Sequence, residues 1–241
     1  MNKKINPSDK FIIALDGMDR KRVLHFLEKI PDLIWVKVGL ELFVSEGPDI
    51  LSLLRDQGKK IFLDLKFHDI PTTVSKACFF AAQTGAEFIS LHVCSGEKAL
   101  KRANEAASEG AAKVNLPPPT LLGVTVLTSW TQESFLKDLL ISQSIDERVN
   151  HLAALASTSG IGGCVCSPKE VKFLREIYPE PFELVTPGIR QIGSNVNDQA
   201  RVSDVSKALE MGASKLVIGR AITNSSDPGT IFKNFCKQVV Q

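Results

Sequence analysis

The chain has 241 residues, 44% of them hydrophobic and 23% charged, which is ordinary for a globular protein with room for one barrel or two smaller domains. Its 29 basic and 27 acidic residues give a net charge of +2 without any basic block, so we expect no nucleic-acid partner. No apolar run is long enough to span a membrane, and the N-terminus lacks the apolar core of a signal peptide. We therefore expect no membrane association and a cytoplasmic location.

Eight short apolar runs recur along the chain, each rich in Ile, Val, Leu or Phe. Such runs are typical of strands that are buried on both faces of a parallel sheet. In chain order they are residues 11–15, 33–39, 60–66, 87–93, 121–127, 160–166, 182–189 and 215–220.

Amphipathic stretches of helical length lie between these runs, at residues 19–30, 49–58, 71–85 and 198–212. The last three end in glycine, a common helix stop, and Pro71 stands where proline is favoured, in the first turn. This alternation predicts an α/β fold, a TIM (β/α)8 barrel with a single domain over residues 1–241 and an N-terminal extension at residues 1–9. The alternative is a doubly wound open sheet, but "LDGMDR" after the first run is not its Gly-rich dinucleotide loop.

The five cysteines are too few and too scattered for a disulfide framework. Cys164 and Cys166 form a C-x-C pair inside an apolar run. We interpret them as buried small hydrophobic residues, and a metal-binding pair is the less favoured alternative.

Charged residues gather where the first three runs end. They are Asp16, Lys37, Asp64 and Lys66, with Asp69 in the loop that follows. Because residues two apart on a strand point to the same face, Asp64 and Lys66 are expected to point together into the barrel, at the end where such barrels carry their chemistry. A catalytic site is favoured, and a structural ion pair at the barrel mouth is the alternative.

Glycines and arginines mark the ends of the last two runs, in "TPGIR" and "VIGRAIT". The loops at these two places frequently bind phosphate in barrels of this type, so Arg190, Gly219 and Arg220 are candidate phosphate ligands. Two surface arginines near turns are the alternative. The polar segment 191–199 is either a lid whose Gln199 reaches the phosphate or a loose loop.

These motifs together resemble the orotidine 5′-phosphate decarboxylase family, in its short bacterial branch. "FLDLKFHDIPTTV" carries the pattern D-x-K-x-x-D-I-P-x-T, and "IALD", "VKVGLELF", "VTVLTS", "TPGIR" and "VIGRAIT" are similar to the other blocks of the family, in the same order. The resemblance extends over roughly residues 10–235.

The resemblance implies decarboxylation of orotidine 5′-phosphate to uridine 5′-phosphate in pyrimidine biosynthesis, by a homodimer without a metal or organic cofactor. Lys66 would protonate C6 of the pyrimidine and Asp64 would lie beside the substrate carboxylate. Lys37 and Asp69 would complete an alternating set of charges, with Asp69 and Thr73 reaching the site of the partner subunit. The substrate-binding residues that the resemblance implies are Asp16, Lys37, Ile70, Thr73, Thr128, Ser129, Pro187, Arg190, Gln199, Gly219 and Arg220.

Lysine between aspartates suits this reaction. Loss of CO2 leaves a carbanion on an sp² carbon, with no ring orbital aligned to accept the electron pair. Placed positive charge in a pocket of low dielectric can stabilise that pair, and flanking carboxylates keep the lysine charged. Two other functions remain open: a Mg²⁺-dependent sugar-phosphate decarboxylase or synthase on the same kind of barrel, and a non-catalytic protein that binds nucleotide phosphate.

Overall fold

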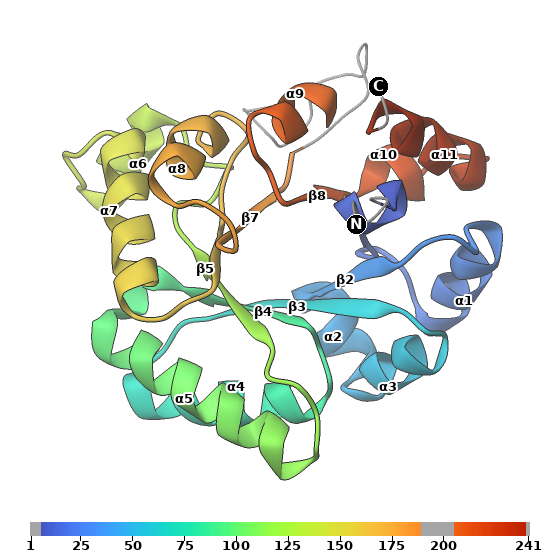
Figure 1. Ribbon diagram of the computed structural model, residues 1–241, viewed down its shortest axis with the longest axis horizontal. Helices are drawn as coiled ribbons and strands as arrows, with labels where there is room; N and C mark the ends of the chain where they lie inside the picture. The colour runs from blue at the N-terminus through green and yellow to red at the C-terminus, as the bar shows by residue number, and fades with distance from the viewer. Residues whose placement is uncertain (1–5, 189–204, 240–241) are drawn as a thin grey trace, which may run out of the picture.

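The computed structural model describes residues 6–188 and 205–239, and its eight strands close into a parallel barrel (Figure 1). Each strand pairs with its neighbours in chain order, and the last pairs with the first. This confirms the predicted (β/α)8 barrel over the open sheet. The strands are β1 (Phe11–Ala14), β2 (Trp35–Gly39), β3 (Lys60–Phe67), β4 (Phe88–His92), β5 (Thr120–Val124), β6 (Gly163–Val165), β7 (Glu183–Thr186) and β8 (Lys215–Ile218).

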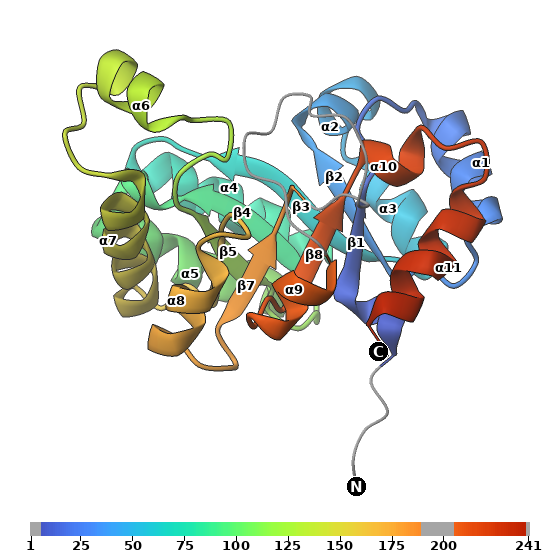
Figure 2. The same cartoon turned by 90° about the horizontal axis from the view of Figure 1, so that it is seen from above.

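Helices cover the outside of the barrel, and none of those described is long and apolar enough to cross a membrane. Figure 2 shows the strands from the side, with α6 standing away from the barrel beyond their carboxyl ends. The helices are η1 (Pro7–Lys10), α1 (Arg20–Lys29), α2 (Leu40–Glu46), α3 (Asp49–Asp56), α4 (Pro71–Gln83), η2 (Val93–Ser95), α5 (Glu97–Lys113), α6 (Gln132–Leu139), α7 (Ile145–Thr158), α8 (Val171–Ile177), α9 (Val205–Glu210), α10 (Arg220–Thr223) and α11 (Pro228–Gln238).

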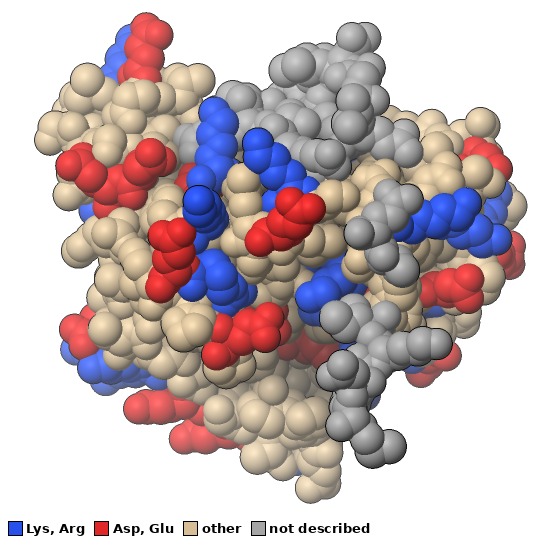
Figure 3. All heavy atoms as spheres, turned by 45° about the horizontal axis from the view of Figure 1, so that its top comes forward, with Lys and Arg blue, Asp and Glu red and all other residues tan. Residues whose placement is uncertain are grey.

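The first three predicted helical stretches correspond to α1, α3 and α4, and Pro71 is in the first turn of α4 as expected. Of the fourth stretch, α9 covers residues 205–210, and residues 198–204 lie outside the described part of the chain. Acidic and basic side chains are interspersed over the face in Figure 3, as their near balance in the sequence suggests.

Strand alternation creates two apolar cores, one inside the barrel and one between the barrel and the helices. The inner core consists of Ile12, Ala14, Trp35, Phe62, Phe88, Leu122, Val185 and Val217. Ile13 and Leu63 point the other way and pack in the outer core. Cys164 and Cys166 are fully buried in this outer core, and burial raises the pKa of the Cys164 thiol to about 12. Their interpretation as buried small side chains is confirmed.

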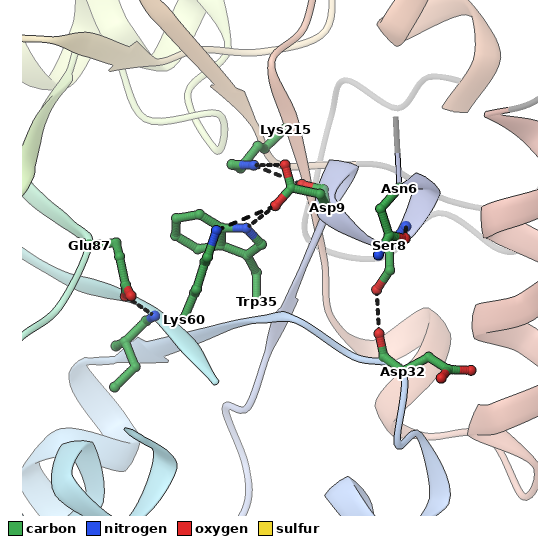
Figure 4. Close-up of polar contacts among 9 residues, drawn as sticks. Asn6, Ser8, Asp9, Asp32, Trp35, Lys60, Glu87 and Lys215 are labelled. Atoms are coloured by element: carbon green, nitrogen blue, oxygen red, sulfur yellow. Dashed lines mark hydrogen bonds and ion pairs between the residues drawn. The ribbon is translucent and has the colours of Figure 1, made fainter. Parts of the chain in front are cut away.

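A polar cluster around Asp9 lies at the amino-terminal end of the barrel (Figure 4). Its carboxylate accepts hydrogen bonds from Trp35 Nε1 at 2.8 Å and from Lys215 Nζ at 3.1 Å. Burial acts to raise the pKa of Asp9, but the Trp35 bond and the Lys215 charge outweigh it and hold that pKa below its ordinary value. Asp9 is the last residue of the N-terminal extension predicted from the sequence, residues 1–9, and its carboxylate contacts the first residues of β2 and β8.

Candidate active site

A cavity of about 830 Å³ opens at the carboxyl ends of the strands, above the inner core. Apolar side chains such as Phe62 and Val217 form its base, and polar side chains form its wall. The sequence-predicted site residues that line this cavity are Asp16, Lys37, Asp64, Lys66, Thr128, Pro187, Gly219 and Arg220.

Four charges alternate along the wall of this cavity. Lys37 Nζ lies 2.8 Å from Asp16 Oδ2 and 3.5 Å from Asp64 Oδ2. Lys66 Nζ lies 2.7 Å from the same Asp64 oxygen. We call Asp16, Lys37, Asp64 and Lys66 the charge array. It joins the ends of three neighbouring strands, so barrel closure brings together groups that are up to 50 residues apart in the sequence.

Strand register explains how the charge array forms. Ala14 pairs with Lys37 across β1 and β2, and Gly39 pairs with Asp64 across β2 and β3. Trp35 and Phe62 belong to the inner core, so the residues two positions further along each strand, Lys37 and Asp64, point inward as well. The charge array is therefore the next layer of the barrel interior, above the apolar one.

Gly39 provides the space in which two of these charges meet. A Cβ atom built on Gly39 would overlap Asp16 Oδ1 and lie 2.8 Å from Lys37 Nζ. No larger residue can stand there without displacing that ion pair.

Lys66 reaches the charge array from an irregular backbone. Its φ is +51°, in the left-handed region that non-glycine residues rarely adopt. The pairing of β3 with β4 shifts register between Leu63 and Phe67, as in a β-bulge. The side chains of Asp64 and Lys66 meet as predicted. The irregular backbone at Lys66 brings them together, however, and not the regular strand alternation from which the prediction was made. Strain of this kind is concentrated at functional sites.

Asp64 is held as a carboxylate. Burial alone would raise its pKa, but the charges of Lys37 and Lys66 and the hydrogen bonds from Lys66 and Ser90 outweigh burial and lower that pKa. The Lys66 side chain is 29% exposed, whereas those of Lys37 and Asp64 are 11% and 9% exposed. Both lysines line the cavity, and Lys66 is the more accessible of the two, so its ammonium can stabilise negative charge on a bound molecule or donate a proton to it.

Four other predicted site residues, Asp69, Ile70, Thr73 and Ser129, are exposed and lie outside the described lining of this cavity. The Asp69 carboxylate accepts a 2.6 Å hydrogen bond from the backbone of Ile70. Within this subunit it makes no ion pair with any described residue. Arg190 and Gln199 lie outside the described residues.

The cavity also has polar lining residues that are not predicted from the sequence, among them Arg22 and Glu41. Both contact Gly17, directly after Asp16: Arg22 Nη1 donates to its carbonyl oxygen at 2.8 Å, and Glu41 Oε2 accepts from its N–H at 3.2 Å. They hold the turn that carries Asp16. Neither residue lies on a strand. The expectation that site residues lie at the carboxyl ends of strands therefore does not identify them.

Comparisons with known proteins agree over nearly the whole chain. Residues 9–235 match the family described as orotidine 5′-phosphate decarboxylase / HUMPS. A protein of Prochlorococcus marinus (strain NATL1A) named orotidine 5′-phosphate decarboxylase is 74% identical over 234 residues, which are 97% of each chain. One of the same name from Synechococcus sp. (strain WH7803) is 54% identical over 98% of this chain and 97% of its own.

A solved structure is similar as well. The crystal structure of orotidine 5′-phosphate decarboxylase from Lactobacillus acidophilus matches with a TM-score of 0.83 and 36% sequence identity. The match covers 95% of this chain and 98% of that one.

Proposed function

Because this chain belongs to the orotidine 5′-phosphate decarboxylase / HUMPS family, we propose that it converts orotidine 5′-phosphate into uridine 5′-phosphate and CO2, a step of pyrimidine biosynthesis. The observation that carries the proposal is the charge array on the cavity wall, with the ammonium of Lys66 accessible from the cavity. A cytoplasmic location is part of the proposal, since nucleotide synthesis takes place there.

In the proposed reaction the bond between C6 and the carboxylate carbon breaks, and its electron pair stays on C6 as CO2 leaves. The Lys66 ammonium stabilises that pair and donates a proton to C6, and the lysine then regains a proton from water. Asp64 lies beside the substrate carboxylate, and the repulsion between the two carboxylates is relieved when CO2 departs. Lys37 keeps Asp64 ionised when the Lys66 proton has been transferred.

The remaining cavity residues bind the nucleotide in this proposal. Asp16 and Lys37 contact the ribose, and Thr128 holds the pyrimidine edge together with Ser129 from the same loop. Gly219 and Arg220 bind the phosphate beyond β8, where Pro187 also lines the cavity. Arg190 and Gln199 are proposed to complete the phosphate site. Binding energy from the phosphate, remote from the bond that breaks, is then available at the transition state.

The proposal includes a homodimer in which Asp69, Ile70 and Thr73 contribute to the site of the partner subunit. Asp69 is exposed and unpaired with any described cation, so its carboxylate is available to a neighbouring chain. The adjacent Ile70 is 67% exposed. A large apolar side chain left in water beside Asp69 favours a protein interface there.

The test is the loss of orotidine 5′-phosphate absorbance with purified protein, with and without EDTA. We expect turnover that EDTA does not change, because each of the two array carboxylates is already ion-paired with a lysine ammonium group. Binding of the nucleotide without loss of absorbance would contradict the decarboxylase proposal. Activity that disappears on chelation would instead favour the Mg²⁺-dependent alternative.

A further inference from the structure

Ser90 lies next to the charge array and contacts two of its members, Asp64 and Lys66. It follows Phe88 of the inner core by two positions on β4, so its side chain also points into the barrel. Ser90 is fully buried and does not belong to the cavity lining. Its hydroxyl group donates a 2.8 Å hydrogen bond to Asp64 Oδ1 and accepts a 2.9 Å hydrogen bond from the backbone N–H of Lys66.

The first of these bonds fixes the orientation of the Asp64 carboxylate. Asp64 Oδ2 faces the ammonium groups of both Lys37 and Lys66. Oδ1 is the oxygen that accepts the hydrogen bond from Ser90 Oγ. With both oxygens engaged, the carboxylate cannot rotate without losing a charge-assisted bond.

The second bond supports the irregular backbone of Lys66. The register shift between β3 and β4 takes this part of the strand out of regular pairing, and the N–H group of Lys66 bonds to a side chain. Without that acceptor, an N–H group at a positive φ would have no partner, and unpaired buried N–H groups are costly. Ser90 thus stabilises the conformation in which the ammonium of Lys66 reaches Asp64.

We propose that Ser90 is a positioning residue, which acts through its two hydrogen bonds to hold the Asp64 carboxylate and the Lys66 backbone in the geometry that the reaction requires. This inference rests on the proposed decarboxylase function. Because Ser90 does not line the cavity, it should govern turnover and leave binding of the nucleotide largely unchanged.

The test compares the kcat, KM and pH profile of the wild type with those of Ser90→Ala and Ser90→Cys, the latter nearly isosteric but a weak hydrogen-bond donor. Ser159→Ala is the matched control, since Ser159 is buried and its hydroxyl has no hydrogen-bond partner among the described residues. We expect Ser90→Ala to lower kcat roughly ten- to hundredfold with KM nearly unchanged, and Ser90→Cys to lower it less. The control should retain wild-type kcat.

The pH profile adds a readout that a purely structural residue would not move. The Ser90 hydrogen bond lowers the pKa of Asp64, so its removal should shift the acid limb of the kcat profile to higher pH. Wild-type kcat in folded Ser90→Ala or Ser90→Cys, or a loss confined to KM, would overturn the positioning role. If neither variant folds, the positioning role is also overturned, because Ser90 would then be required for folding itself. An inactive wild-type protein would instead contradict the proposed function itself.

Discussion

Lys37 lies on β2 and Asp16 in the turn that follows β1, and their side chains form a 2.8 Å ion pair in the space above the bare backbone of Gly39. We predict that Gly39→Ala folds but loses about tenfold or more in kcat/KM, because the atoms nearest to the added methyl group are the flexible side-chain ends of Asp16 and Lys37, which it displaces. Thermal unfolding and steady-state kinetics measure the two effects.

A double variant provides the control for this prediction. In an Asp16→Ala background the ion pair is already absent, and the space that the Asp16 carboxylate leaves allows Lys37 Nζ to move away from the added methyl group. Gly39→Ala should therefore have a smaller further effect on kcat/KM in that background than in the wild type. An undiminished loss in that background would mean that the methyl group acts through some other contact.

Removal of the accessible ammonium should abolish turnover. Lys66→Ala is expected to fold, since Lys37 still compensates the charge of Asp64, and to lose nearly all kcat. The matched control is Lys101→Ala, which removes an exposed ammonium that pairs with Glu97 on α5. Retention of more than about a tenth of wild-type turnover in Lys66→Ala would contradict its proposed role as proton donor.

The loop after β8 is predicted to recognise the phosphate. Arg220→Ala should raise KM for orotidine 5′-phosphate by roughly ten- to hundredfold, the usual effect of one charge-assisted bond, and should change turnover of the unphosphorylated nucleoside orotidine much less. Kinetics on the two substrates measure this directly. Equal losses on both would argue that Arg220 does not bind phosphate.

A mixture of two inactive variants can reveal whether Asp69 serves the partner subunit. Lys66→Ala and Asp69→Ala should each be nearly inactive alone. After unfolding and refolding together, half of the dimers should be mixed and each should hold one complete site, so about a quarter of wild-type activity should return. No recovery, with mixed dimers present by mass spectrometry, would place Asp69 in its own subunit's site.

The polar cluster at the other end of the barrel should matter for acid stability. The folded-state pKa of Asp9 is lowered, so its contribution to stability is present above its unfolded pKa of about 3.9 and is lost as the pH falls through the folded value. Asp9→Asn should therefore reduce the free energy of unfolding at neutral pH, and the difference from wild type should shrink in acid. Urea unfolding at several pH values measures this. A difference that does not change with pH would mean that charge is not what Asp9 contributes.

The barrel could be predicted from the sequence because its signals are local. Strands buried on both faces must be apolar along their whole length, and every such run appears as a strand at nearly the predicted place. Asp64 and Lys66 stood out for the same reason, as charges in a run that otherwise belongs to the interior. Asp16 and Lys37 followed from the rule that chemistry lies at the carboxyl ends of the strands.

Periodicity and chain order are enough to predict which residues face the interior and which strand ends carry charge. How those charges meet depends on the folded barrel. The register shift that gives Lys66 a positive φ, the hydroxyl of Ser90 that satisfies its N–H, and the space that Gly39 leaves for an ion pair all depend on distances between strands. Such distances are set by closure of the barrel, and no pattern along a single strand encodes them.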